Sequence, residues 1–142
     1  MLPTTVLFAC THNAGRSQMA AALFNQLCDP ALARAISAGT RPADRVHPEV
    51  VEAMREAGVD VAGARPRLLT PELAGEAGVL VTMGCGEECP YVPGVTVIDW
   101  NIPDPKGRPI DEVRLIRESV QACVVQLLHA RGWGQRKTAG DP

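Results

Sequence analysis

Cys10 and Arg16 are the residues of this sequence whose types and spacing most clearly indicate chemistry. They fall in the run Cys10–Ser17, where a thiol, a guanidinium and several backbone N–H groups can converge on one point. A thiolate is a strong nucleophile, and a planar guanidinium pairs with two oxygens of a tetrahedral anion. The run therefore predicts a site at which sulfur attacks the central atom of an oxyanion, either phosphorus or arsenic.

The flanking sequence predicts that this run is a turn between a strand and a helix. Residues 5–9 form a short β-branched and apolar run, which favours a strand buried on both faces. After Ser17, apolar residues recur at helical spacing as far as Leu27, and Asp29 and Pro30 end the helix. The backbone N–H groups of such a turn, and of the helix N-terminus, bind anions. A buried cysteine beside an unrelated surface arginine is the alternative, and this context disfavours it.

The residues that follow the cysteine each have an expected role. The anion is expected to contact the loop made of Thr11, His12, Asn13, Ala14 and Gly15. Asn13 and Gly15 suit positive φ angles. Arg16 is expected to hydrogen-bond to two anion oxygens. Ser17 is expected to donate a hydrogen bond to the sulfur and to cap the helix. His12 is expected to face solvent, with tuning of the thiolate as the alternative.

The composition excludes several function classes. At 142 residues the chain is one domain, and its formal net charge of −2 gives no basic surface for nucleic acid or an anionic membrane. The apolar runs are too short to span a bilayer, and the start at Met1–Thr4 lacks the positive region of a signal peptide. The sequence therefore predicts a cytoplasmic protein. No metal or other cofactor is expected.

The five cysteines, an odd number, favour thiol chemistry over a framework of structural disulfides. Cys28 lies four residues after Phe24, and Cys123 falls on the apolar stripe of the last expected helix. These two are expected to be small core residues.

Strands alternate with helices along the chain. Beyond the first pair, the expected strands are residues 35–38, 79–83 and 95–100, and the expected helices are residues 47–58, a short helix after Thr70 and residues 111–133. This order predicts an α/β fold, a single-domain three-layer sandwich with a central parallel sheet of about four strands. The catalytic domain is expected to span residues 1–133, and residues 134–142 are expected to form a mobile tail.

Cys85 and Cys89 form a second thiol site. In parallel sheets, ligands bind beyond the carboxyl ends of the strands, and Cys85 follows the strand at 79–83 as Cys10 follows the first strand. If these strands are neighbours, Cys10 and Cys85 meet over the anion. Cysteines four apart on a helix have Cβ atoms about 5–6 Å apart, so a disulfide between Cys85 and Cys89 would distort the turn. Two small buried loop residues, or an incomplete zinc site, are the alternatives.

Asp104 is a candidate general acid. Pro103 and Pro105 hold it on a stiff loop that follows the strand at 95–100, near the same edge of the sheet. A carboxylic acid there could protonate the oxygen that leaves the oxyanion. A turn or cap aspartate is an equally good interpretation from the sequence alone.

Three motifs together resemble a known family. They are residues 10–20, residues 83–90 and residues 99–105. They are similar to those of the arsenate reductases built on the low-molecular-weight protein tyrosine phosphatase fold, and the resemblance spans nearly the whole chain. The resemblance implies that Cys10 attacks arsenate held by the loop and Arg16, while Asp104 acts as the general acid.

The resemblance also implies a disulfide relay. Cys85 attacks Cys10 and releases arsenite, and Cys89 then attacks Cys85, which leaves a Cys85–Cys89 disulfide for thioredoxin to reduce. The short spacing between Cys85 and Cys89 is also similar to that of members that use mycothiol or another small thiol with a glutaredoxin-like partner. Some members bind potassium through an acidic side chain where this chain has Ala21, so no potassium site is expected.

The main alternative is a phosphotyrosine phosphatase that uses the same nucleophile without redox chemistry. Against it, Gln18 stands where similar phosphatases usually carry proline, and Lys106 and Gly107 stand where they usually carry aromatic residues. The second thiol site would also have no role. A module that binds an oxyanion without turnover is a third possibility, and it leaves the acid Asp104 unexplained.

Overall fold

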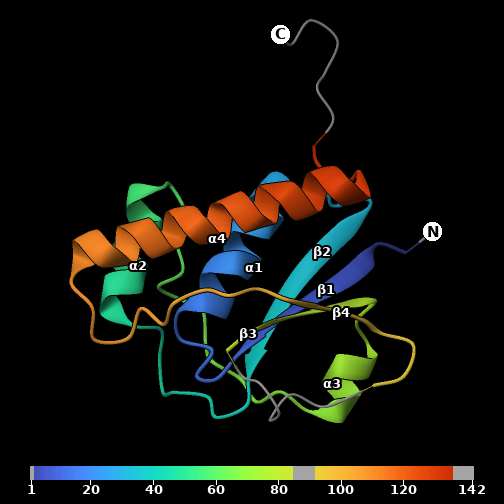
Figure 1. Ribbon diagram of the computed structural model, residues 1–142, viewed down its shortest axis with the longest axis horizontal. Coiled ribbons are helices and arrows are strands. Elements are labelled where there is room, and N and C mark those ends of the chain that lie inside the picture. The colour runs from blue at the N-terminus through green and yellow to red at the C-terminus, as the bar shows by residue number, and fades with distance from the viewer. Residues whose placement is uncertain (1, 85–91, 136–142) are drawn as a thin grey trace, which may run out of the picture.

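The computed structural model describes residues 2–84 and 92–135. In these ranges the elements are, in chain order, β1 (Thr4–Cys10), α1 (Arg16–Leu27), β2 (Ala33–Gly39), α2 (Pro48–Glu56), α3 (Pro71–Gly75), β3 (Val79–Met83), β4 (Thr96–Asp99) and α4 (Ile110–Arg131). Figure 1 shows three layers, in which α1, α2 and α4 cover one face of the sheet and α3 lies on the other. The predicted three-layer α/β sandwich is confirmed. No helix in the described ranges is long and apolar enough to cross a membrane.

The four strands of the described sheet are all parallel and follow the order β2-β1-β3-β4. β1 is therefore central, with β2 on one side and β3 on the other. Cys10, the last residue of β1, lies opposite Gly39 at the end of β2 and Met83 at the end of β3. The condition that the first strand and the strand at 79–83 are neighbours is therefore met, and the chain leaves β3 at the edge of the sheet where Cys10 lies. Cys85 and Cys89 lie outside the described residues.

β1 is buried on both faces, as its apolar run predicts. Val6 and Phe8 belong to the larger core under α1, α2 and α4, whereas Leu7 and Ala9 belong to the smaller core on the side of α3. Successive side chains of a strand alternate between faces, so an uninterrupted apolar run contributes to both cores. Cys10 belongs to the same core as Val6 and Phe8, and its thiol therefore lies on the face covered by α1.

Aromatic contacts join the loops at the carboxyl edge to this core. The ring of Phe8 lies 5.7 Å from the ring of Phe24 in α1 and 5.5 Å from the ring of Trp100, just after β4. Phe24 also contacts Trp133, at 6.1 Å. Each such pair contributes about 0.5–1.5 kcal/mol beyond its buried area. The contacts of Phe8 with Phe24 and Trp100 therefore pack β1, α1 and the start of the loop after β4 against one another.

Some element boundaries differ from the sequence prediction. β2 begins at Ala33 rather than at residue 35, because Ala33 and Arg34 pair with the start of β1. β4 covers Thr96–Asp99 rather than 95–100, because only those residues pair with β3. α4 ends at Arg131 rather than at residue 133, because Gly132 takes a left-handed φ of 68° that stops the helix.

The first two residues of the expected tail contact the end of α1. Gly134 forms an isolated antiparallel bridge with Cys28. The backbone N–H of Gln135 donates to the carbonyl of Leu27, and its side-chain amide donates to the carbonyl of Gln26. The rest of the expected tail, residues 136–142, lies outside the described residues.

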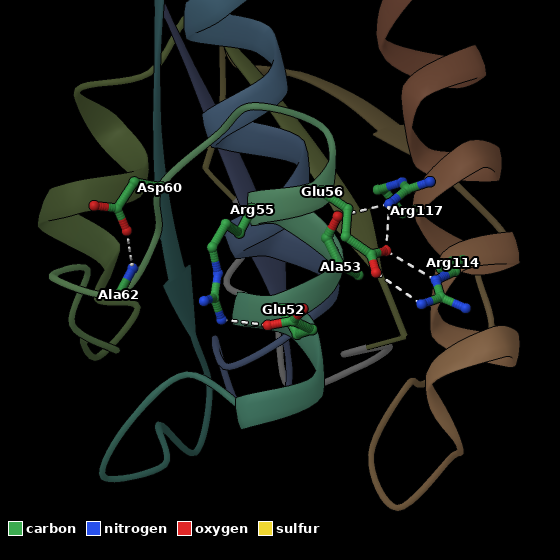
Figure 2. A network of polar contacts seen from close by, with 8 residues as sticks. All are labelled: Glu52, Ala53, Arg55, Glu56, Asp60, Ala62, Arg114 and Arg117. Carbon is green, nitrogen blue, oxygen red and sulfur yellow. Dashed lines mark hydrogen bonds and ion pairs between the residues drawn. The ribbon is translucent and has the colours of Figure 1, made fainter.

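A polar network holds α2 against α4 (Figure 2). Glu56, at the end of α2, accepts two hydrogen bonds from Arg114, at 2.8 and 2.7 Å, and pairs with Arg117 at 3.5 Å. The hydrogen bonds from Arg114 lower the pKa of Glu56 below its usual value. Arg117 also donates to the backbone carbonyl of Ala53 at 2.6 Å. Because α2 begins one residue after His47, this network also helps to fix the loop that carries His47.

Arg117→Ala is expected to destabilise the protein more than Arg114→Ala. The side chain of Arg117 is 15% exposed, and losing its hydrogen bond to the Ala53 carbonyl should lower the free energy of unfolding by about 1–2 kcal/mol. The side chain of Arg114 is 44% exposed, so solvent and salt screen its ion pair. Urea unfolding of both variants at low and high salt tests this order. A larger loss for Arg114→Ala would contradict it.

Candidate active site

The turn predicted around Cys10 is confirmed, since residues 11–15 link the end of β1 to the start of α1. Asn13 takes the left-handed conformation, with a φ of 51°, as its residue type allows. The same expectation for Gly15 is wrong, because its φ is −142°. An ideal Cβ on Gly15 would lie 2.6 Å from Cγ of Pro105. Position 15 therefore requires a glycine, because the loop after β4 approaches too closely to leave space for a Cβ.

Cys10 is 2% exposed, and its Sγ lies 2.9 Å from Oγ of Ser17. The contact predicted between Ser17 and the sulfur is therefore present. The second role predicted for Ser17, helix capping, is wrong. α1 already begins at Arg16, so Ser17 lies inside the first turn, and no described side chain caps this N-terminus. The hydroxyl of Ser17 is buried beside the thiol instead.

Arg16 connects three segments at the carboxyl edge of the sheet. Its side chain is 10% exposed. Nη1 donates to the carbonyl of Ile102 at 3.1 Å, and Nη2 lies 3.8 Å from Oδ2 of Asp104. On the other side, an ideal Cβ built on Gly84 would overlap the guanidinium. The guanidinium is thus held between the loop after β4 and the segment after β3.

Asp104 lies beside Arg16 and also forms a turn. One carboxylate oxygen accepts a hydrogen bond from the backbone N–H of Lys106 at 3.0 Å, as a turn aspartate does. The other oxygen faces Arg16. Both interpretations of Asp104 from the sequence therefore agree with its geometry. Its side chain is 42% exposed, so the carboxyl group can exchange protons with solvent.

Gly84 is the last described residue before the segment that contains Cys85 and Cys89. Its φ is 85°, a conformation that glycine adopts without steric cost. Its carbonyl accepts a hydrogen bond from the hydroxyl of Thr11 at 3.2 Å. Gly84 is therefore held against the loop that follows Cys10.

His47 is a residue of this site that the sequence pattern did not identify. Its backbone N–H donates to the carbonyl of Ala14 at 2.9 Å, and its ring Cδ2 lies 3.6 Å from an ideal Cβ on Gly15. Burial lowers the pKa of His47, and the nearby charge of Asp104 partly opposes this effect. The sequence signalled only that a histidine and a proline open a helix, which says nothing about the neighbours of the imidazole.

The residues of the loop differ in their exposure. Thr11 and His12 are partly exposed, whereas Asn13 and Ala14 are buried. The carbonyl of His12 accepts a hydrogen bond from the backbone N–H of Ala43 at 2.9 Å, which ties the loop to the chain after β2. His12 as a residue is partly open to solvent, in keeping with the first of its two expected roles.

Cys28 and Cys123 are core residues, as predicted. Cys28 is 2% exposed and its Sγ donates to the carbonyl of Ala33 at 3.3 Å, while Cys123 is half-buried against the same core. Burial raises the pKa of both thiols, which disfavours the reactive thiolate. Neither joins a metal site, because within the described ranges no cluster of histidine, cysteine and carboxylate side chains could hold a metal ion.

The fold and the site define an α/β protein with a cysteine and an arginine on one strand-to-helix turn, next to a carboxylate. The family model described as low molecular weight phosphotyrosine protein phosphatase matches residues 5–136 of the chain. The chain belongs to this family.

Several similar proteins bear the name of an arsenate reductase. A Halobacterium salinarum protein, provisionally named as one, is 37% identical over 126 residues, which are 84% of this chain and 87% of that protein. The structure of the Corynebacterium glutamicum thioredoxin-dependent arsenate reductase is similar with a TM-score of 0.78 and 35% identity, and the match covers 90% of this chain but 61% of that chain. An Archaeoglobus fulgidus arsenate reductase gives a TM-score of 0.76 and 31% identity, over 87% of this chain and 98% of that chain.

Gly84→Ala is expected to weaken oxyanion binding about tenfold or more, because the new Cβ would displace the Arg16 guanidinium. Gly94→Ala is the matched control. Gly94 has a similar φ of 87°, and nothing lies within 4 Å of its ideal Cβ, so that variant carries the backbone strain without the clash. Calorimetric titration with inorganic phosphate and arsenate measures the binding. Equal losses in the two variants would assign the effect to backbone strain rather than to Arg16.

His47→Asn is expected to make the stability of the protein less sensitive to acid. Because the pKa of His47 is lower in the folded chain than its ordinary value of 6.5, protonation favours the unfolded chain. The wild-type protein should therefore lose stability as the pH falls below about 6.5, and the variant should lose less. Urea unfolding near pH 7.5 and near pH 5 measures the difference. Equal acid sensitivity of the two proteins would be evidence against the burial of a neutral imidazole.

Proposed function

We propose that this chain is an arsenate reductase that converts arsenate to arsenite by a thiol relay that starts at Cys10. The observation that carries the proposal is the meeting of Cys10, Arg16 and Asp104 at the edge of the sheet where β3, which precedes Cys85, ends. The names of the similar proteins support the reaction. Residues 1–133 would act as the catalytic unit, and a reaction that needs free thiols fits the cytoplasmic location expected from the sequence.

In the first step, the Cys10 thiolate attacks arsenic. The backbone N–H groups of residues 11–15 and the guanidinium of Arg16 hold the arsenate oxygens. The hydroxyl of Ser17, 2.9 Å from the sulfur, favours the thiolate. Asp104 gives a proton to the departing hydroxyl group, which leaves as water. The product is a covalent bond between sulfur and arsenic, with arsenic still pentavalent.

In the second step, the Cys85 thiolate attacks Sγ of Cys10. The sulfur–arsenic bond breaks and its electron pair passes to arsenic, so arsenite leaves and a Cys10–Cys85 disulfide remains. The Cys89 thiolate then attacks Cys85, which frees Cys10 as a thiolate and leaves a Cys85–Cys89 disulfide. The position of Gly84 against the loop supports this order, because Cys85 follows it directly in the sequence.

A dithiol reductant must restore the Cys85–Cys89 pair, and we propose thioredoxin. The similar Corynebacterium glutamicum protein is named for its dependence on thioredoxin, which supports the choice. The short spacing of Cys85 and Cys89 also fits a second reductant. This reductant is mycothiol or another small thiol, which acts with a glutaredoxin-like partner. With a small thiol, that thiol would attack Sγ of Cys10 in place of Cys85, and the glutaredoxin-like partner would then reduce the mixed disulfide and free Cys10.

Cys85→Ser and Cys89→Ser are expected to stop multiple-turnover arsenate reduction with thioredoxin and thioredoxin reductase, because Cys10 stays bonded to arsenic in the first variant and to Cys85 in the second. Cys10→Ser should abolish all chemistry. Cys123→Ser replaces a half-buried cysteine outside the relay, so it is the control and should keep the wild-type rate. Arsenite formation at steady state measures the outcome.

Two results would change the proposal. Turnover at the wild-type rate by Cys85→Ser or Cys89→Ser with thioredoxin would contradict the relay. Restored turnover of both variants by mycothiol and a glutaredoxin-type protein would instead identify a small thiol as the reductant.

A phosphatase is the second candidate function, favoured by the family of the chain and by the presence of Cys10, Arg16 and Asp104 together. These three groups suffice to hydrolyse a phosphate monoester through a phosphocysteine. Under our proposal, weak hydrolysis of an aryl phosphate persists in Cys85→Ser while arsenate turnover is lost. If the wild-type protein hydrolysed the aryl phosphate efficiently and did not reduce arsenate, the phosphatase would be the correct function.

A further inference from the structure

Gln18 is a buried polar residue for which the steps above provide no role. It lies in the first turn of α1 and is 6% exposed. Its Nε2 donates to the backbone carbonyl of Asn13 at 3.1 Å and to Oδ1 of the same residue at 3.3 Å. Burying an amide costs free energy unless its polar atoms find partners, and here both contacts fall on one residue of the loop.

Two backbone groups fix the orientation of the Gln18 and Asn13 amides. A carbonyl can only accept a hydrogen bond, so the Gln18 atom that faces the Asn13 carbonyl must be its nitrogen. A backbone N–H can only donate, so the Asn13 atom that faces the N–H of Arg67, at 3.0 Å, must be Oδ1. Turning either amide over would set two donors or two acceptors against each other.

The fixed amide of Asn13 decides where the proton of Ser17 points. Nδ2 of Asn13 donates to Oγ of Ser17 at 2.7 Å. Because this oxygen accepts from Asn13, its own proton is free to point to Sγ of Cys10, 2.9 Å away. The four residues that these hydrogen bonds join, which are Cys10, Asn13, Ser17 and Gln18, are each exposed by 6% or less. Bulk solvent therefore offers little competition for the hydrogen bonds.

We propose that Gln18 is a positioning residue that, with the backbone N–H of Arg67, sets the direction of the hydrogen-bond chain from Asn13 through Ser17 to Cys10. With this direction, the sulfur receives a proton donor and its thiolate is favoured. With the Asn13 amide reversed, the proton of Ser17 would turn to Oδ1 and the thiolate would lose its donor. The inference rests on the proposed role of Cys10 as the nucleophile, and Gln18 acts through its neighbours.

The test measures the rate of Cys10 alkylation by iodoacetamide as a function of pH, which reports the fraction of thiolate. The tryptic peptide of residues 1–16 contains Cys10 and no other cysteine, so mass spectrometry follows this thiol alone. Gln18→Met keeps the size of the side chain and removes the donor. Gln26→Met makes the same change at an exposed position of the same helix and is the matched control.

In Gln18→Met the midpoint of the alkylation profile is expected to rise by about one pH unit, while Gln26→Met leaves it unchanged. A double-mutant cycle separates positioning from a general structural effect. Ser17→Ala removes the last donor of the chain, so Gln18→Met should add no further shift in that background. Gln18→Leu serves in the same cycle if Gln18→Met does not fold.

An unchanged midpoint in the Gln18 variant, or an equal further shift in the Ser17→Ala background, would overturn the inference. The assay needs no arsenate, so its result is separate from the proposed function. If the midpoint shifts and no arsenate is reduced, the proposed function fails and the inference stands. If arsenate is reduced and the midpoint does not shift, only the inference fails.

Discussion

The parallel pairing of β1 with both β2 and β3 is the constraint on which the rest of the structure depends. Because neighbouring strands run in the same direction, the segments that leave their carboxyl ends come together at one edge, beside Cys10. The fit there is close. An ideal Cβ on Gly39, at the end of β2, would lie 2.6 Å from the carbonyl of Thr11. The strand pairing thus brings segments that are far apart in the sequence against the loop that follows Cys10.

The site is held by polar groups that are buried and satisfied. Arg16 contacts the carbonyl of Ile102, and Asn13, Ser17 and Gln18 contact one another. Unsatisfied polar groups in such a place would cost about 1–3 kcal/mol each. The geometry of the thiol therefore depends on a closed set of hydrogen bonds, and removing one member should disturb the others. Gly39 and Gly84 lie where a Cβ would overlap Asn13 or Arg16, so the close approach of these segments requires glycine.

The three described cysteines lie in two different environments. Cys28 and Cys123 lie among core side chains, where burial raises the pKa of the thiol and keeps it inert. Cys10 is as buried as Cys28, but it lies at the end of a strand, before a helix N-terminus and against a hydroxyl. A helix N-terminus and a hydroxyl donor are neighbours of the kind that stabilise a negative charge. Strand order and the helix start, rather than residue type, give the Cys10 thiol these surroundings.

The amino-acid sequence was enough to predict the α/β layers and the turn after Cys10, but it left the pairing of β1 with β3 as a condition that the structure then met. Hydrophobic periodicity and turn residues are local signals, and a strand buried on both faces is visible as an uninterrupted apolar run. Three contacts became visible in the folded protein alone: His47 lies beside the loop, Gly15 faces Pro105, and the backbone N–H of Arg67 donates to Asn13. These contacts join residues from separate elements, and their distances depend on how the layers pack. No pattern along the chain carries that information, because packing selects among many pairs of side chains that the sequence allows.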